Sequence, residues 1–439
     1  MKYFGTDGIR GNAKELFTYE LSYRIGFFLG RYQKSNKLVV GYDTRESGPT
    51  IAKAIIEGVK ASGGAIIDIA VIPTPAIAYI VQKHDFDYGI MISASHNPYV
   101  DNGIKIFDRQ GYKISPMVEK EIERFIDGEI KLYPRKEKVA AIQLSATKLR
   151  QDYINYLRES FISKQKFNLL IDAANGSASA IIDEVLSGFP VEVTYINKEP
   201  NGVNINLNGG STDLTVLQDL IKAEPGKYDY GVAFDGDADR VLFVDAQGEV
   251  LDGDHIMFLL GKYYKDKGLL HQNTVVLTLM ANYGLFKALK QHDIKAVVTD
   301  VGDKYIQREI IKNDYTVGGE QSGHIIFNKI VKSGDGIFTM LEILNILSDV
   351  GVTFNEYTRD FKKYPQILLN IAVSDKQKVL GNAELEKAMA VVHEKLDDSG
   401  RLLVRASGTE NLIRVMVEAQ DQEVAHRLAT GIIEVIKKI

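Results

Sequence analysis

The chain contains no cysteine among its 439 residues. This absence excludes disulfide bonds, thiolate metal sites and a cysteine nucleophile, and it suits a protein of a reducing compartment. Residues 1–7 contain no apolar signal core, and no run of about 18 uninterrupted apolar residues occurs anywhere. The most apolar stretch, residues 66–81, is interrupted by Asp68, Pro73 and Pro75. We therefore expect a cytoplasmic protein that does not enter a membrane.

Basic residues are not in excess, since the formal net charge is -5. The sequence thus lacks the basic footprint of a nucleic-acid-binding protein, and an anionic small molecule would need a local basic pocket. No low-complexity segment occurs, and the length predicts two to four domains. The sequence does not determine whether the protein is a monomer or a homodimer.

Three carboxylates crowd one short loop at Asp235, Asp237 and Asp239, followed directly by Arg240. Like charges this close raise one another's pKa, and a hard divalent cation relieves the repulsion. A calcium loop of the EF-hand type needs glycine at the sixth position and glutamate at the twelfth, where this loop has Arg240 and Ala246. A solvated acidic turn is the remaining alternative. We predict a magnesium site.

A second loop follows the apolar run 88–92 and has the sequence Ser-Ala-Ser-His-Asn-Pro. Ser95 is predicted at the end of this buried strand, with His96 beside it and Lys105 further along the chain. A serine becomes a nucleophile or a phosphate carrier when a base, a metal or a cation lies next to it. Taken alone, the motif is more typical of a turn whose side chains bond their own backbone, and it gains weight only together with other motifs.

One arrangement recurs three times: a β-branched run, a loop of small residues, an amphipathic helix and a second β-branched run. It spans residues 38–69, 169–193 and 275–298. These are predicted βαβ units. In open α/β sheets ligands bind beyond the carboxyl ends of the strands, so the three loops at 41–45, 172–177 and 280–284 are expected to converge on one site.

The last 80 or so residues follow another pattern. Strands are predicted at 366–371, 401–405 and 412–417, and helices at 383–396 and 424–436, which together form a smaller α+β domain. The polar stretch 353–363 is the predicted hinge. The fold class is therefore three tandem, related α/β domains and an α+β domain around a central cleft. The predicted boundaries are 1–150 for the domain with the Ser95 loop, 151–250 for the domain with the aspartate loop, 251–360 for the domain with the loop 317–324, and 361–439 for the domain with the loop 405–410.

Two further loops suit a phosphorylated sugar. Residues 405–410 combine an arginine, two hydroxyls and a glycine turn, which is a pattern typical of phosphate-binding nests, and Arg414 offers a second cation. Residues 317–324 place acceptors, donors and His324 between glycines, as polyhydroxylated ligands require. A hairpin turn and a capped turn are the respective structural alternatives.

Taken together and in this order, the loops 93–98, 235–240, 319–324 and 405–410 resemble those of the α-D-phosphohexomutase family. The similarity extends over nearly the whole chain. The opening residues 3–11 and Gln321 resemble the amino-sugar branch of that family. Ala406 and Asn411 depart from the pattern, since proline is common at both positions in this branch, and the loss of proline loosens the loop without removing a phosphate donor.

The resemblance implies a role for each loop. It implies a phosphoserine at Ser95 and Mg²⁺ held by a phosphoserine oxygen with the three aspartates. It places Arg10, Lys105 and Arg240 near the reacting phosphate, and Glu320 and Ser322 on sugar hydroxyls. The residues implied to hold the non-reacting phosphate are Arg405, Ser407, Gly408 and Thr409.

The implied reaction interconverts glucosamine 6-phosphate and glucosamine 1-phosphate. Phospho-Ser95 gives its phosphate to the sugar, and the resulting 1,6-bisphosphate returns its other phosphate to Ser95. A hexose or hexosamine 1,6-bisphosphate is the expected activator. We expect Lys105 to be the general base, with His324 second, because a lysine between cations has a lowered pKa.

Three alternatives remain. A phosphoglucomutase or phosphomannomutase would use the same machinery on another sugar. A metal-dependent phosphatase would use Ser95 but would not need the loop 405–409. A non-catalytic sugar-phosphate sensor would not need Ser95 or the aspartates.

Overall fold

The computed structural model describes residues 2–5, 7–32, 37–137, 139–328, 332–407 and 411–439. The chain divides into two compact units. The first comprises Met1–Met280 and Ile294–Thr358, and the second comprises Ala281–Asp293 and Arg359–Ile439. The last division of the chain falls inside the stretch 353–363 that we predicted as a hinge.

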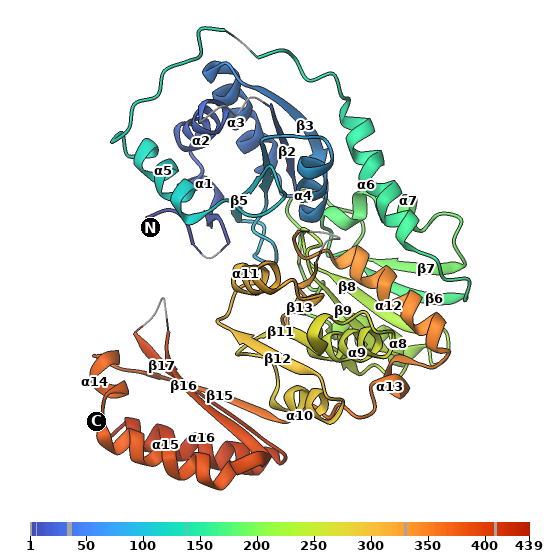
Figure 1. Cartoon of the computed structure of the whole chain (residues 1–439), viewed down its shortest axis with the longest axis vertical. Helices are drawn as coiled ribbons and strands as arrows, with labels where there is room; N and C mark the ends of the chain where they lie inside the picture. The colour runs from blue at the N-terminus through green and yellow to red at the C-terminus, as the bar shows by residue number, and fades with distance from the viewer. Residues whose placement is uncertain (1, 6, 33–36, 138, 329–331, 408–410) are drawn as a thin grey trace. The chain divides into compact units, whose positions relative to one another are not determined.

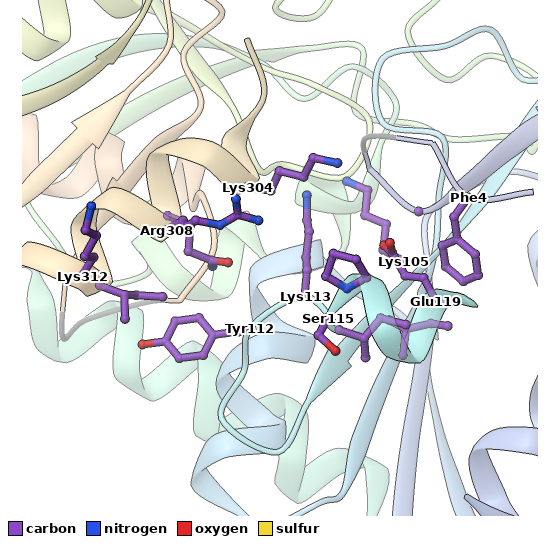
Figure 2. A pocket seen from close by; sticks show the side chains of 15 residues that line it. Phe4, Lys105, Tyr112, Lys113, Ser115, Glu119, Lys304, Arg308 and Lys312 are labelled. Atoms are coloured by element: carbon purple, nitrogen blue, oxygen red, sulfur yellow. The ribbon is translucent and has the colours of Figure 1, made fainter. Parts of the chain in front are cut away.

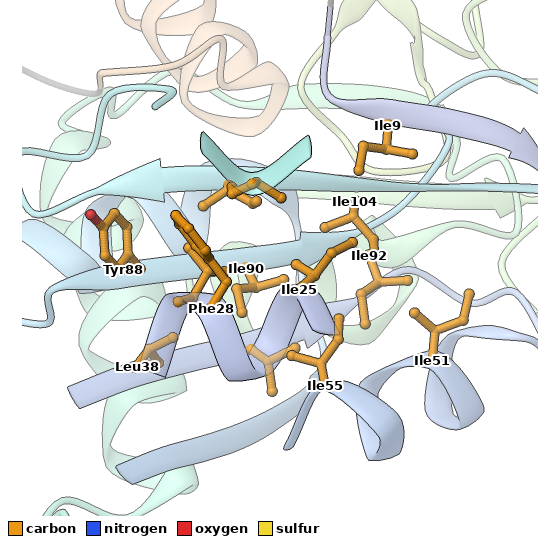
Figure 3. Packing of buried hydrophobic residues seen from close by; sticks show 14 of the residues in the cluster. Ile9, Ile25, Phe28, Leu38, Ile51, Ile55, Tyr88, Ile90, Ile92 and Ile104 are labelled. Atoms are coloured by element: carbon orange, nitrogen blue, oxygen red, sulfur yellow. The ribbon is translucent and has the colours of Figure 1, made fainter. Parts of the chain in front are cut away.

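The first sheet has the order β1-β5-β4-β2-β3, in which β2 is parallel to β3 and β4, while β5 is antiparallel to β4 and β1. Its strands are β1 (Ile9–Asn12), β2 (Lys37–Tyr42), β3 (Ala65–Val71), β4 (Tyr88–Ile92) and β5 (Asp101–Asp108). Its helices are α1 (Ala13–Leu16), α2 (Tyr19–Arg31), α3 (Gly48–Ser62), α4 (Thr74–Lys83) and α5 (Pro116–Ile126). Ile25 and Phe28 of α2 pack with Ile55 of α3 against Ile90 and Ile104 of the sheet (Figure 3). This core fixes the strand ends that carry the serine loop.

The second sheet has the order β10-β9-β8-β6-β7, in which strands β6 to β9 repeat the arrangement of β2 to β5 in the first sheet. Strand β6 is parallel to β7 and β8, and β9 is antiparallel to β8 and β10. Its strands are β6 (Phe167–Asp172), β7 (Val191–Ile196), β8 (Tyr230–Phe234), β9 (Val241–Asp245) and β10 (Val250–Leu251). The helices of this region are α6 (Ala146–Ser160), α7 (Ile182–Leu186) and α8 (Thr215–Ala223).

The third sheet has the order β12-β11-β13-β14 and again joins parallel strands to one antiparallel strand, β14. Its strands are β11 (Thr274–Thr278), β12 (Lys295–Thr299), β13 (Val317–Gly319) and β14 (Ile325–Phe327). The helices here are α9 (Gly253–Asp266), α10 (Tyr283–Gln291), α11 (Asp303–Asn313), α12 (Gly336–Val350) and α13 (Phe354–Tyr357). All three predicted βαβ units are thus confirmed.

The fourth sheet is antiparallel, with the order β15-β17-β16. Its elements are β15 (Gln366–Ala372), α14 (Lys376–Leu380), α15 (Ala383–Leu396), β16 (Gly400–Ala406), β17 (Leu412–Ala419) and α16 (Gln422–Ile436). Helices α15 and α16 lie side by side along this sheet (Figure 1). The predicted α+β domain is confirmed.

Helix α10 belongs to the second unit, although its sequence lies between two strands of the third sheet. The Asn282 side chain donates to the carbonyl of Tyr364 over 2.9 Å and accepts from its amide over 2.8 Å. The buried carboxylate of Glu418 accepts from the amide of Tyr283 at 3.0 Å and from Arg401 Nη2 at 2.8 Å. Asn282 and Tyr283 therefore serve the fold of the second unit, and the loop 280–284 is divided between the units.

The common topology places the functional loops at equivalent positions. In each α/β sheet, a parallel strand (β4, β8 or β13) ends in a loop that turns into the antiparallel strand (β5, β9 or β14). Those loops are the serine loop 93–98, the metal loop 235–240 and the sugar loop 320–324.

Among the described residues, no helix combines the length and apolar character needed to cross a membrane.

Candidate active site

Ser95 lies directly beyond β4 in a left-handed backbone conformation, with φ +53°. A left-handed conformation is strained for a residue other than glycine and persists only where its surroundings enforce it. Here the Ser95 amide donates to Ser93 Oγ over 2.8 Å, and its carbonyl accepts from Arg45 Nη2 at 3.0 Å and Asn206 Nδ2 at 2.9 Å. The Ser95 hydroxyl donates to Asp235 Oδ2 over 2.6 Å. The serine therefore faces the metal loop.

The loop after β2 holds the serine loop in place. Arg45 is fully buried, and its Nε donates to Asp43 Oδ2 over 2.9 Å. The same carboxylate oxygen accepts from Ser93 Oγ at 2.6 Å, and Arg45 Nη2 also donates to the carbonyl of Asn97 over 2.8 Å. This network accounts for the predicted convergence of the loop 41–45 on the site.

The loop after β6 supports the metal loop in the same way. The Ser177 amide donates to the carbonyl of Gly236 over 2.8 Å, and the Asn206 amide donates to the carbonyl of Ala174 over 2.8 Å. A Cβ atom at Gly236 would lie 2.6 Å from the carbonyl oxygen of Ser95, so only glycine lets the two loops approach this closely. Two of the three loops predicted to converge therefore do so.

Asp235, Asp237 and Asp239 are buried, and each offers a carboxylate oxygen within 4.8 Å of the others. Burial, and then the charges of the other two aspartates, hold the pKa of Asp235 well above its ordinary value. Asp237 Oδ1 is buried and accepts no hydrogen bond from any described residue, and the nearest cations to Asp239 Oδ1 lie at 3.5 Å and beyond. Buried carboxylate oxygens without a partner are costly, and a hard divalent cation would satisfy them. The donor set therefore fits Mg²⁺.

Lys105 is buried and points into the aspartate cluster, with Nζ 2.7 Å from Asp237 Oδ2 and 2.9 Å from Asp239 Oδ2. Burial lowers the pKa of a lysine, but Asp237, Asp239 and then Asp7 outweigh burial and hold the pKa of Lys105 well above its ordinary value. Our expectation that neighbouring cations lower this pKa is therefore wrong for this arrangement. The amine lies among carboxylates, which favour its protonated form.

The remaining basic residues of the site surround the serine. Arg10 forms an ion pair with Asp7, and Arg240 Nε lies 3.8 Å from Asp239 Oδ1. His96 Nδ1 lies 3.3 Å from Ser95 Oγ. Burial, together with the nearby charges of Arg240 and Arg10, lowers the pKa of His96 to about 4. The imidazole is thus neutral at pH 7, whereas both guanidinium groups carry a positive charge.

A closed ring of alternating charges connects all three α/β domains. Each member contacts the next, and the last contacts the first. In order, the members are Lys105, Asp239, His324, Asp303, Lys113 and Asp7.

His324 closes the ring on the side of the sugar loop. Its Nδ1 lies 3.5 Å from Asp239 Oδ1, and its Nε2 lies 3.5 Å from Asp303 Oδ2. Burial opposes the charged form, yet Asp239 and then Asp303 raise the pKa of His324 above its ordinary value. This shift favours the imidazolium, the form that completes the alternation of charge in the ring.

The sugar loop presents one carboxylate and one free hydroxyl. Glu320 Oε1 accepts from the amide of Gly302 at 3.1 Å, and Ser322 Oγ is buried with no hydrogen-bond partner among the described residues. Gln321 Nε2 donates to Asp254 Oδ2 over 3.2 Å. The side chain that suggested the amino-sugar branch thus makes a contact within the protein.

The predicted phosphate loop lies in the second unit, between β16 and β17. Gly408 and Thr409 lie outside the described residues. Arg405 and Arg414 are directly opposite each other on the two strands, and Lys376 Nζ donates to the carbonyl of Ser407 over 2.9 Å. Like charges opposite each other destabilise an antiparallel pair. This concentration of positive charge suits an anion.

The two departures from the family pattern have structural roles here. Ala406 continues β16 and pairs with Ile413, and the carbonyl of Asn411 accepts from the amide of Val373 at 3.0 Å. Neither position contributes a charge to the loop.

Sequence reasoning missed Asp7, Lys113 and Asp303. Asp7 lies in the opening motif that we used for the resemblance, but its contact with Lys105 across 3.4 Å joins positions distant in sequence. Lys113 and Asp303 belong to no recognised motif. An isolated charged residue in a sequence does not reveal which residue it will pair with in the folded protein.

We expect Lys113→Met to destabilise the protein by about 1–3 kcal/mol, because two half-buried carboxylates would lose the cation between them. The turnover number should fall more than the affinity for substrate, since the change acts on the ring rather than on a sugar contact. Urea unfolding and steady-state kinetics provide the measurements. Lys113→Arg keeps the charge and should recover most of the loss, and equal defects in both variants would contradict the role of charge.

Four models of one family match consecutive parts of the chain. They describe phosphoglucomutase/phosphomannomutase alpha/beta/alpha domain I at residues 1–132, domain II at 151–248, domain III at 252–364 and the C-terminal domain at 368–435. The phosphoglucosamine mutase of Limosilactobacillus reuteri is 41% identical over 449 aligned residues, which cover 100% of this chain and 98% of that protein.

Solved structures share the fold at lower identity. A phosphoglucomutase/phosphomannomutase family protein from Burkholderia thailandensis matches with a TM-score of 0.83 and 20% identity over 99% of this chain and 97% of that one. The N-acetylphosphoglucosamine mutase of Aspergillus fumigatus, solved with GlcNAc-6P and magnesium, matches with a TM-score of 0.71 and 19% identity over 99% of this chain and 95% of that one.

Proposed function

Because the chain belongs to the phosphoglucomutase/phosphomannomutase family, we propose that it is an isomerase that interconverts glucosamine 6-phosphate and glucosamine 1-phosphate. The observation that carries this proposal is the 41% identity to a phosphoglucosamine mutase over the whole chain. Such a reaction supplies amino-sugar nucleotide and cell-wall precursor synthesis. The four domains proposed are residues 1–150, 151–250, 251–360 and 361–439, and these boundaries stay a prediction, since helix α6 runs across the first of them.

Ser95 is the proposed phosphate carrier. In the first transfer, the bond between Ser95 Oγ and phosphorus breaks, a bond forms from phosphorus to the sugar O1, and the hydroxyl proton passes to a base. The 1,6-bisphosphate then returns its 6-phosphate to Ser95 Oγ. A hexose or hexosamine 1,6-bisphosphate is the proposed activator, because it carries a phosphate that Ser95 can accept.

The charge of the transferred group is the main obstacle to phosphoryl transfer, and positioned cations lower it. Arg10 and Arg240 are proposed to hold the equatorial oxygens, since both guanidinium groups lie near Ser95 and the aspartates. Asp235, Asp237 and Asp239 would hold Mg²⁺, which when bound supplies a further positive charge to the phosphoryl oxygens. The assignment of the general base to Lys105 or His324 stays a prediction.

The sugar and its second phosphate require separate contacts. Glu320 and Ser322 are proposed to bind sugar hydroxyls, since Ser322 Oγ has no described partner. Arg405, Ser407, Gly408, Thr409 and Arg414 are proposed to bind the non-reacting phosphate. A phosphatase would not need this second anion site, and a sensor would not need the serine and the aspartates.

We expect Arg405→Ala to weaken the binding of glucosamine 6-phosphate at least tenfold, which is about 1.4 kcal/mol. The fold should persist, because the change removes a repulsive cross-strand pair with Arg414. Calorimetric titration with the sugar phosphate measures the effect, and the exposed Arg427→Ala is the matched control. Unchanged affinity in Arg405→Ala would make the loop a structural turn.

Substrate identity is tested by kinetics on three sugars. Glucosamine 6-phosphate should have a higher kcat/KM than the glucose or mannose 6-phosphate, each measured with its matching bisphosphate activator. A site that hydrogen-bonds the substrate amine loses binding energy when that partner is replaced. If a glucose or mannose phosphate is preferred, the chain is a phosphoglucomutase or phosphomannomutase with the same site.

A further inference from the structure

A cavity of about 490 Å³ lies between the first and third α/β domains. Helix α11 forms one wall through Lys304, Arg308 and Ile311, and the segment from Tyr112 to Pro116 forms the opposite wall (Figure 2). Cavities of this size hold drug-sized or cofactor-sized molecules.

The cavity adjoins the proposed active site without coinciding with it. Of the described residues assigned to phosphate, sugar or metal binding, only Lys105 lines it. Neither the serine loop, nor the metal loop, nor the sugar loop contributes to its described lining. A molecule bound there would therefore not occupy the position of the transferred phosphate.

Positive charge dominates the wall formed by α11. Lys304, Arg308 and Lys312 line the cavity at intervals of four residues along the helix, a spacing at which like charges repel. Glu119 is the one acidic residue in the described lining. In the described part of the chain, Lys304 and Arg308 form no ion pair, although both lie near the ring of Tyr305, at 5.4 and 5.9 Å. An anion would relieve this repulsion.

Six other residues give the lining an apolar part. Phe4, Ile106, Ile114, Pro116 and Ile311 contribute hydrocarbon surface, and Tyr112 adds an aromatic ring. A bare phosphate ion or a hexose phosphate would leave this surface without a partner. The lining favours a ligand with a phosphate group at one end and, at the other, a flat ring whose faces can pack on this apolar surface.

We propose that this cavity is a regulatory site for a phosphate ester that carries a planar ring, the chemical class of the nucleoside diphosphates. The phosphates bind Lys304 and Arg308, and the planar body packs between Tyr112, Pro116 and Ile311. Lys113 lines the same cavity and connects Asp7 to Asp303 in the ring of charges. A bound anion competes for Lys113, loosens the ring and lowers turnover, a consequence that rests on the proposed mutase function.

Binding is tested apart from catalysis. Uridine 5′-diphosphate, which carries two phosphates and a planar base, is titrated calorimetrically into the full chain, with uridine as the unphosphorylated comparison. We expect saturable binding of the diphosphate, none of uridine, and at least tenfold weaker binding to Arg308→Gln and to Lys304→Gln. Lys166→Gln is the matched control, because it removes one exposed cation that pairs with Glu192 and does not line the cavity.

Equal affinity in the wild type and both cavity variants would overturn the proposal. So would displacement of the diphosphate by glucose 1,6-bisphosphate, which would place it in the substrate site. If the diphosphate binds as expected but leaves kcat unchanged, the regulatory role is wrong and the binding site stands. If the wild type has no mutase activity, the proposed function is wrong, but the result of the binding titration is unaffected.

Discussion

Ser95→Ala is expected to lower mutase turnover by at least three orders of magnitude, which corresponds to about 4 kcal/mol in the transition state. We expect so large an effect because Ser95 Oγ forms and breaks a covalent bond to phosphorus in the proposed cycle. The Ser95 hydroxyl donates to Asp235 Oδ2 over 2.6 Å, so it faces the proposed metal ligands. Alanine offers no such atom.

Turnover is measured together with phosphorylation. After treatment with glucose 1,6-bisphosphate, intact mass and peptide mapping should find one phosphate on Ser95 of the wild type and none on Ser95→Ala. Ser187→Ala, which changes an exposed serine at the end of α7, should retain both phosphate and turnover. Near-normal turnover of Ser95→Ala would exclude the phosphoserine mechanism.

Asp237→Asn is expected to lower kcat by two to three orders of magnitude, or about 3–4 kcal/mol. An amide is a poor ligand for Mg²⁺ compared with a carboxylate, and the neutral side chain would also leave Lys105 with one fewer counter-charge. The fold should persist, because asparagine has the same shape as the aspartate and can still accept from Thr74.

Stability gives a second measurement that does not depend on turnover. Mg²⁺ at 100 times its Kd should raise the free energy of unfolding of the wild type by about 2.7 kcal/mol, and this gain should be lost in Asp237→Asn. Asp219→Asn, an exposed carboxylate on α8, should behave as the wild type does. Full activity of the wild type in EDTA would refute the metal site.

Most of the fold could be predicted because its signals are local. Strand β4 is recognisable from the buried run Tyr88–Ile92, and α15 from the apolar periodicity of Ala383–Leu396. The assignment of α10 to the second unit could not be predicted, because it depends on a contact between Tyr283 and Glu418, which are far apart in the sequence.

The site shows the same division between local and distant information. The aspartates 235, 237 and 239 lie within five residues, so the sequence alone shows that their carboxylates are close together. The metal loop could therefore be predicted directly. The direction of the pKa shift of Lys105 was predicted wrongly, because the sequence neighbours of this residue do not show which carboxylates lie next to its amine in the folded protein. The ring through Lys113 and Asp303 exists only once three domains have assembled.

Helix α10 is synthesised well before the residues with which it forms a compact unit, and this separation affects the order of folding. Residues 281–293 leave the ribosome before the strands and helices of 359–439 with which they form one compact unit. Until those residues are synthesised, Asn282 cannot form its hydrogen bond to Tyr364, and Tyr283 cannot form its hydrogen bond to Glu418. Closing so long a loop is entropically slow, so the second unit is expected to fold only after translation has passed its last strand, β17. A ribosome that pauses between residues 294 and 358 would hold α10 exposed, and this interval is where we expect chaperones to bind the nascent chain.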